Sequence, residues 1–161
     1  MSAKEILYRL PDGTIAYLEM HSPERILMDK GLAPDGDVQT FHTQNVLRRI
    51  QKYMPMGSGM TIKVTIAQTD IRKPRIVTNT PYARFLFNGK LMVDPVTGVA
   101  GFMTPNGWRS RKNVPKVESS RPISYNKSKN PLAGPRWDQH LIAAEGHALS
   151  ADLQAYINHK K

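Results

Sequence analysis

GDVQTFHTQNVLRRIQKYMPMGSGM, residues 36–60, contains the element around which the rest of the fold is arranged. Asp37 stands at the positive end of a helix dipole, and Arg48 and Arg49 stand at its negative end. Pro55 then stops a helix. We therefore predict a long amphipathic helix that begins near Asp37. Its apolar residues recur mostly every three or four positions and form one core-facing side: Val38, Phe41, Val46, Leu47, Ile50, Tyr53 and Met54.

The residues after this helix predict a pair of antiparallel strands. Apolar and polar residues alternate over Thr61–Gln68, which is typical of a strand with one buried side and one side in water. Arg75–Asn79 predicts a second strand, because its β-branched residues favour a sheet. Residues 71–74 are the expected connection between the two strands.

A short aromatic helix and a further strand are predicted next. Thr80 is suited to cap a helix, and Gly89 is suited to the left-handed conformation that ends one. The residues between them, Tyr82–Asn88, therefore predict a helix whose aromatic side chains pack on the sheet. Leu91–Val93 predicts the further strand.

The N-terminal residues predict a hairpin followed by an arm. Ile6–Met20 alternates weakly around the turn sequence of residues 11–14, which favours two short paired strands. Pro23 and the Pro- and Gly-rich residues 31–36 interrupt regular structure. We expect this stretch to be an irregular arm that leads into the long helix.

The C-terminal part predicts a long loop and then a helix. Residues 94–120 are rich in Pro, Gly and Asn around a short apolar stretch, Gly101–Met103, so this loop is expected to hold at most a hairpin. The apolar residues of 137–157 predict a C-terminal helix. Gly146 weakens its middle, so the sequence allows one helix or two.

These elements together predict an α+β protein of 161 residues, long enough for one modest core. The long helix is expected to pack on a small, mostly antiparallel sheet beside the short aromatic helix and the C-terminal helix. We divide the chain into an N-terminal arm and hairpin, residues 1–36, and an α+β domain, residues 37–161. The domain carries the long loop 94–120.

Composition excludes several kinds of site and of protein. The chain has no cysteine, which removes disulfides, thiolate zinc sites and cysteine nucleophiles. It lacks an apolar run that could span a membrane, and its start lacks the order of a signal peptide, so we expect a soluble protein with no membrane partner. The net charge is +10, although residues 1–37 hold four basic and seven acidic side chains. The remaining residues are strongly basic, which favours a polyanion or an acidic protein as partner.

The sequence contains no recognisable set of catalytic, cofactor-binding or metal-ligating residues. His140 and His147 lie seven positions apart on the predicted C-terminal helix, about 10 Å along its axis, which is too far for one metal ion. Residues 57–59 resemble a phosphate-binding loop only superficially, because the lysine of that motif is missing. We therefore expect no enzyme, no cofactor and no metal site.

The candidate interface lies in the long loop. Trp108 is followed closely by three cations, Arg109, Arg111 and Lys112. An aromatic side chain among cations suits a protein-interface anchor, which we favour. The same combination also suits stacking on bases and binding of phosphates, so contact with DNA stays open.

Three segments, in this order, carry a resemblance to a known family. They are residues 36–60, with their long helix and Tyr-x-Pro-Met turn; residues 79–93, NTPYARFLFNGKLMV; and residues 124–141, SYNKSKNPLAGPRWDQHL. In order and spacing they resemble the minor capsid or tail-completion family of phage head-to-tail gene blocks. The chain departs from the family at Asn88, where an aromatic residue is common, and in its long acidic start.

The resemblance implies a non-enzymatic structural protein of the head-to-tail connector, or neck, of a tailed bacteriophage virion, assembled in the host cytoplasm. It implies a homo-oligomeric ring, a hexamer before a dodecamer, between the stopper (head-completion) protein and the tail terminator protein around the DNA channel. Two alternatives stay open. One is a basic nucleic-acid-binding module, and the other is a tail terminator or tail-tube protein.

Overall fold

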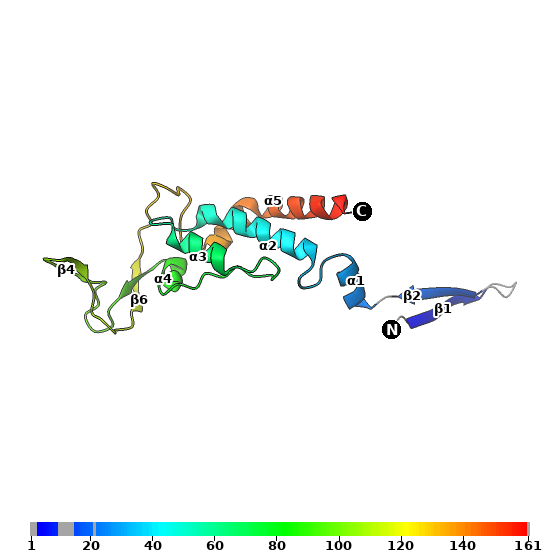
Figure 1. The fold of residues 1–161 in the computed structure, drawn as a ribbon, viewed down its shortest axis with the longest axis horizontal. Helices are drawn as coiled ribbons and strands as arrows, with labels where there is room; N and C mark the ends of the chain where they lie inside the picture. The colour runs from blue at the N-terminus through cyan, green and yellow to red at the C-terminus, as the bar shows by residue number, and fades with distance from the viewer. Residues whose placement is uncertain (1–2, 10–14, 21, 161) are drawn as a thin grey trace.

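A computed structural model describes residues 3–9, 15–20 and 22–160 of the chain. The molecule is elongated, with β1 and β2 at one end, β4 at the other and most of the helices between them (Figure 1). Helices are combined with short antiparallel strands, so the predicted α+β class is confirmed. In chain order the elements are β1 (Ala3–Arg9), β2 (Ile15–Met20), α1 (Pro23–Asp29), α2 (Asp37–Ile50), the 3-10 helix η1 (Gln51–Tyr53), α3 (Met60–Gln68), α4 (Ala83–Asn88), β3 (Lys90–Val93), β4 (Phe102–Thr104), β5 (Gly107–Arg109), β6 (Val117–Pro122) and α5 (Trp137–His159).

The long helix begins where the sequence predicts. Asp37 lies in the first turn of α2, and the helical path continues through η1 to Tyr53, two residues before Pro55. Arg48 and Arg49 lie in the last turn of α2, where cations stabilise the negative end of the dipole. Apolar side chains buried along it include Val38, Leu47 and Ile50.

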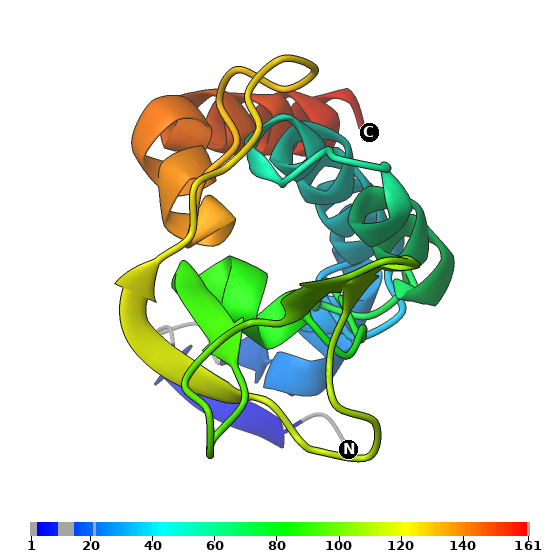
Figure 2. The same ribbon diagram turned by 90° about the vertical axis from the view of Figure 1, so that its left-hand side faces the viewer.

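The main packing partner of α2 is α5 rather than a sheet. Phe41 of α2 stacks on Tyr156 of α5 with ring centroids 4.2 Å apart, and Arg49 at the other end of α2 pairs with Glu145 of α5. The two helices are therefore antiparallel, and they lie side by side in the end-on view of Figure 2. The structure thus replaces the predicted helix-on-sheet packing with a helix pair.

The core lies where α2, η1, α3 and α5 meet. Met54 is fully buried at its centre, and Phe87 of α4 packs edge-on against Trp137 with ring centroids 4.8 Å apart. Burying such side chains is the main source of stability in a domain of this size. The buried members of this cluster are Ile50, Tyr53, Met54, Ile62, Trp137, Leu141 and Leu149.

The predicted strand over Thr61–Gln68 is wrong, because these residues form α3. The buried side of this helix carries Thr61 and Thr65, four positions apart, while Ile66 is exposed. The Thr65 hydroxyl donates to the Thr61 carbonyl at 2.8 Å and meets the Thr78 hydroxyl at 2.6 Å, so both polar groups are satisfied inside the helix packing. Tertiary contacts therefore override the strand preference of the β-branched residues.

The second predicted strand, Arg75–Asn79, is also wrong, and no strand is assigned to these residues. The side chains of Gln68, the last residue of α3, and of Thr69, its C-cap residue, take the place of a neighbouring strand. Gln68 accepts a hydrogen bond from the Asn79 amide at 2.7 Å, and the Thr69 hydroxyl accepts one from the Val77 amide at 3.1 Å. Two backbone amides of this segment thus bond to side chains instead of to a neighbouring strand.

The short aromatic helix and the strand after it are confirmed as α4 and β3. Gly89 ends α4 with a φ of 70°, as its predicted left-handed role requires. Thr80 does not cap the helix, because the N-cap position belongs to Tyr82. β3 pairs with β6 and β4 pairs with β5, both antiparallel, and each sheet among the described residues has two strands.

Both ends of the chain follow the prediction in outline. β1 and β2 form the expected antiparallel hairpin, and the predicted turn at residues 11–14 lies outside the described residues. The expectation that Pro23 interrupts regular structure is wrong, because Pro23 starts α1 and the Ser22 hydroxyl caps it by accepting from the Arg25 amide. α5 is one helix through Gly146. The division between residues 1–36 and 37–161 stays a prediction.

Candidate interaction surfaces

The three segments that carry the family resemblance meet at one place, which we call the motif junction. At its centre the Asn130 side-chain amide donates to the carbonyls of Gln51 at 2.9 Å and Met54 at 2.7 Å. Both carbonyls follow the end of α2, and that of Gln51 also accepts from the Met54 amide at 3.3 Å. Asn130 is buried, so its amide replaces the water that these carbonyls would otherwise bind.

Further contacts join the second and third segments at the motif junction. The Arg136 amide donates to the Phe87 carbonyl at 2.8 Å, and the Tyr125 hydroxyl donates to the Leu86 carbonyl. A Cβ atom on Gly89 would lie 2.9 Å from the Cβ of Pro135, so only glycine fits there. The described contacts at the junction stabilise the fold, so these residues have a structural role.

A polar network beside the junction fastens α2 to α5. The Glu145 carboxylate accepts hydrogen bonds from Tyr53 at 2.6 Å and Arg49 at 2.5 Å, and it lies 2.6 Å from the Lys52 ammonium. Arg49 also reaches Asp152 at 2.6 Å. Contacts to Lys52 and Tyr53, with help from Arg49, outweigh burial and lower the pKa of Glu145 to about 2.

We expect Glu145→Gln to lower the free energy of unfolding by roughly 2 kcal/mol at neutral pH, because two charge-assisted contacts are lost in a largely buried setting. The folded pKa of about 2 lies below the usual 4.5, so the carboxylate stabilises fully above pH 4.5 and progressively less towards pH 2. Urea unfolding across that range should show the wild type and the variant converging as the pH falls. Glu24→Gln, on the exposed surface of α1, is the control and should leave stability nearly unchanged. A difference independent of pH would contradict the assigned role.

The loop 94–120 is anchored at its base by a buried carboxylate. The Asp94 side chain accepts hydrogen bonds from the amides of Val96 at 2.8 Å and Thr97 at 3.1 Å, and its other oxygen lies 2.7 Å from Arg111 Nε. Burial alone would raise the pKa of Asp94, but these two amides and the Arg111 guanidinium hold it below its ordinary value. Arg111 therefore has a structural contact inside its own loop.

The tip of the loop is a small hairpin that presents apolar and cationic side chains. Met103 of β4 lies opposite Trp108 of β5, and the Trp108 ring covers Gly101, where a Cβ atom would lie 2.7 Å from Nε1 of the ring. The structure leaves Trp108 59% exposed, and Arg109 and Lys112 are exposed beside it. All four predicted interface residues are thus exposed, but Trp108 and Arg109 are neighbours in β5 and lie on opposite faces of the hairpin, and Arg111 also contacts Asp94 at the base of the loop.

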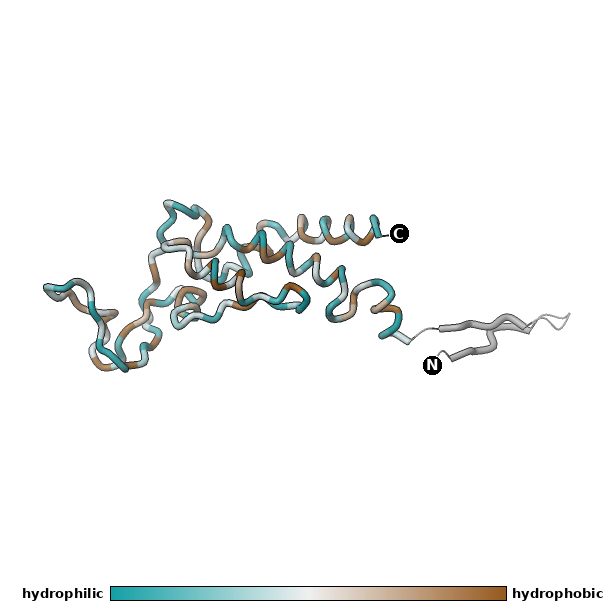
Figure 3. The backbone as a smooth tube through the Cα atoms, in the orientation of Figure 1, coloured by the Kyte–Doolittle hydropathy of each residue, from teal (hydrophilic) through white to brown (hydrophobic). Residues whose placement is uncertain are grey.

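The structure reveals a second apolar surface that the sequence analysis missed. None of the residues of α1 is buried against the described chain, and its side chains Ile26, Leu27 and Met28 are exposed. Hydrophobic segments, brown in Figure 3, accordingly occur at α1 and in the loop as well as among the central helices. The signal was present in the apolar triplet, but treating Pro23 as a breaker concealed the helix that carries it.

The described residues contain no group of three or more His, Cys, Asp or Glu side chains placed to hold a metal ion. His140 and His147 are both exposed on α5. Within the same part of the chain, no helix has the length and apolarity needed to cross a membrane. The exposed apolar side chains of α1 and of the β4–β5 hairpin are the surface features that we interpret below.

Comparisons with known proteins give no further identification. No protein-family model, curated protein sequence or solved structure matches the chain.

Proposed function

We propose that this chain is a structural protein of the head-to-tail neck of a tailed bacteriophage virion. One copy would occupy each position of a ring that joins the stopper protein to the tail terminator protein around the DNA channel. The observation that carries the proposal is the resemblance of residues 36–60, 79–93 and 124–141, in order and spacing, to the tail-completion family. The proposal assigns the chain no catalytic role.

The motif junction supports this proposal. The three segments are far apart in the sequence, yet Asn130, Arg136 and Tyr125 of the third bond directly to the backbone of the first two. A resemblance confined to scattered surface residues would not bear on how the chain folds. Here the similar residues include some that hold one another in place through hydrogen bonds.

The placement of the exposed apolar side chains also supports the proposal of a neck protein. The described chain has one small core, and exposed apolar side chains lie outside it on α1 and on the β4–β5 hairpin. Exposed apolar patches on separate extensions are typical of proteins that become buried in an assembly. A ring component needs such reach, because it must hold neighbours on two sides.

Deletion of the gene from its source phage tests the proposal. Electron microscopy should then show DNA-filled heads without tails beside finished free tails, because both parts are made and only their joining fails. Complementation with the intact gene is the control. Tails of abnormal length, or none, would instead indicate a terminator or tube protein. Normal virions would contradict a role in the neck.

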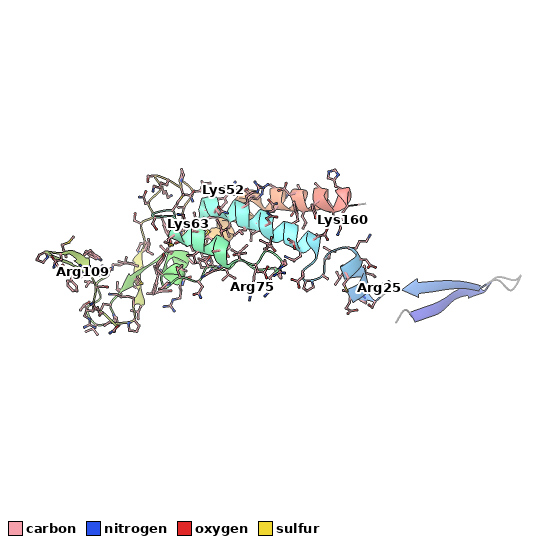
Figure 4. All side chains as sticks on the ribbon, viewed as in Figure 1. Arg25, Lys52, Lys63, Arg75, Arg109 and Lys160 are labelled. Carbon is pink, nitrogen blue, oxygen red and sulfur yellow. The ribbon has the colours of Figure 1, made fainter. Side chains whose placement is uncertain are left out.

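The basic charge motivates the alternative of a nucleic-acid-binding module. The net charge is +10, and cationic side chains such as Lys52, Lys63, Arg75 and Arg109 are spread along the molecule (Figure 4). A dedicated binder should shift DNA tightly, with an affinity that falls steeply as salt rises. A neck protein should bind free DNA weakly and lose it at physiological salt.

A further inference from the structure

Two Asn-Gly pairs occur in the chain, at residues 88–89 and 106–107. Asparagine is among the chemically labile residues, and a following glycine makes it more so, because glycine has no Cβ atom to hinder its backbone nitrogen. That nitrogen can attack the side-chain carbonyl carbon of the asparagine before it. The structure places the two pairs in very different surroundings, so they should differ in reactivity.

Asn106 and Gly107 lie at the tip of the β4–β5 hairpin, where Asn106 belongs to the turn and Gly107 begins β5. Both residues are exposed, and a Cβ atom added to Gly107 would meet nothing within 4 Å. The Asn106 side chain has no hydrogen-bond partner in the part of the chain that the structure describes. Water therefore reaches this side chain, and no described hydrogen bond fixes its orientation.

The hairpin that carries Asn106 is a sheet of two strands with three residues each, at one end of the molecule (Figure 1). The pair closest to the turn is Thr104 with Gly107. A two-stranded hairpin is marginally stable by itself, so this closing pair opens at little cost in free energy. Opening frees the backbone around Asn106 to rotate into the geometry that the attack requires.

Asn88 and Gly89 are held in place from several sides. Asn88 is the last residue of α4, and its side-chain amide donates to Glu118 of β6 at 2.8 Å. The amide of the buried Gly89 donates to the Phe85 carbonyl, and the Gly89 carbonyl accepts from the Ile123 amide at 2.9 Å. Attack at Asn88 would therefore require the end of α4 to unwind.

We propose that Asn106 is a deamidation site of the folded protein, whereas the fold protects Asn88. The Gly107 nitrogen forms a bond to Cγ of Asn106, the bond from Cγ to Nδ2 breaks, and ammonia leaves with the proton of the Gly107 amide. Water then opens the resulting cyclic imide at either of its carbonyls, which leaves an aspartate or an isoaspartate. The reaction consumes only water and needs no oxidant or reductant.

The reaction changes the charge and the shape of the loop that carries the predicted interface. Residues 94–120 hold four basic and two acidic side chains, a net charge of +2, which one new carboxylate lowers to +1. An isoaspartate also lengthens the backbone between residues 106 and 107, next to the pair of Met103 with Trp108. The tip of the loop therefore changes as the protein ages. This inference concerns the chain alone and does not depend on the neck role.

Incubation of the purified full-length protein in mildly alkaline buffer, with samples taken over days, tests the assignment. Peptide mapping by mass spectrometry locates each asparagine whose side-chain nitrogen has been replaced by oxygen. We expect Asn106 to react at least about tenfold faster than Asn88, because that ratio needs only about 1.4 kcal/mol of additional opening free energy at Asn88.

The same incubation in urea removes the fold and is the control. Both asparagines should then react at similar rates, since each is followed by glycine in an unfolded chain. Two matched variants identify the reacting residue in the folded protein. Asn106→Ser should remove most of the conversion, whereas Asn88→Ser should leave it unchanged.

Three outcomes would overturn the proposal: an Asn106 that stays intact in the folded protein, an Asn88 that reacts as fast as Asn106, or a preference for Asn106 that persists unchanged in urea. The last would assign the preference to neighbours in the sequence instead of to the fold. Circular dichroism of the incubated samples checks that the protein stays folded throughout.

Discussion

Trp137→Ala is expected to lower the free energy of unfolding by roughly 3–5 kcal/mol, enough to remove much of the stability of a small domain. Trp137 is 5% exposed and packs edge-on against Phe87, and it belongs to the same buried cluster as Tyr53 and Leu141. It is also the first residue of α5, so its removal loosens the contact between that helix and α4. Urea unfolding followed by circular dichroism measures the loss.

The second tryptophan of the chain provides the control. Trp108→Ala removes the same side chain from an exposed position on β5, so it should change the free energy of unfolding by less than about 1 kcal/mol. Equal losses of stability in the two variants would contradict the placement of the core around Trp137.

Local sequence signals correctly predicted those elements for which several features of the sequence indicate the same structure. α2 has an acid at its start, cations at its end and one apolar face, and each of these features appears in the structure. α4 was predicted from Thr80 and Gly89; Gly89 adopts the required positive φ, whereas Tyr82 rather than Thr80 takes the N-cap position. The C-terminal helix was predicted from its apolar residues, although the sequence left open whether Gly146 divides it.

Tertiary contacts decided the elements that sequence reasoning missed. The residues of α3 alternate as a strand would, but threonines four positions apart also form a helical face, and only the contact between Thr65 and Thr78 distinguishes the two. The segment 75–79 is supported by side chains of Gln68 and Thr69 rather than by a neighbouring strand. Neither arrangement follows from the residues taken one segment at a time.

The candidate surfaces divide in the same way. Trp108, Arg109 and Lys112 were predicted from a run that mixes an aromatic residue with cations, and all three are exposed. The contact between Arg111 and Asp94 spans the loop and becomes visible only in three dimensions. The exposed apolar side chains of α1 were missed because Pro23 was taken as an interruption rather than as the first residue of a helix. Residue types thus predicted the chemical character of each surface better than they predicted its backbone structure.

Asn130→Asp is expected to lower the free energy of unfolding by roughly 3 kcal/mol at neutral pH, although it changes the shape of the side chain very little. The buried Asn130 amide donates to the carbonyls of Gln51 and Met54, and an ionised carboxylate can donate to neither. The substitution therefore brings a negative charge against two backbone acceptors at the motif junction.

The penalty should depend on pH in a defined direction. Burial beside two carbonyls disfavours the charged form, so the pKa of the introduced carboxyl is raised in the folded state above its unfolded value of about 3.9. The destabilisation is accordingly smallest below about pH 4, where the protonated acid still donates one hydrogen bond, and it grows as the pH rises. Asn126→Asp is the control, because the exposed Asn126 accepts from the Ser128 amide at 2.9 Å and a carboxylate accepts equally well. Urea unfolding of both variants from acid to neutral pH should separate them increasingly; parallel curves would show that Asn130 does not hold the junction through its donor.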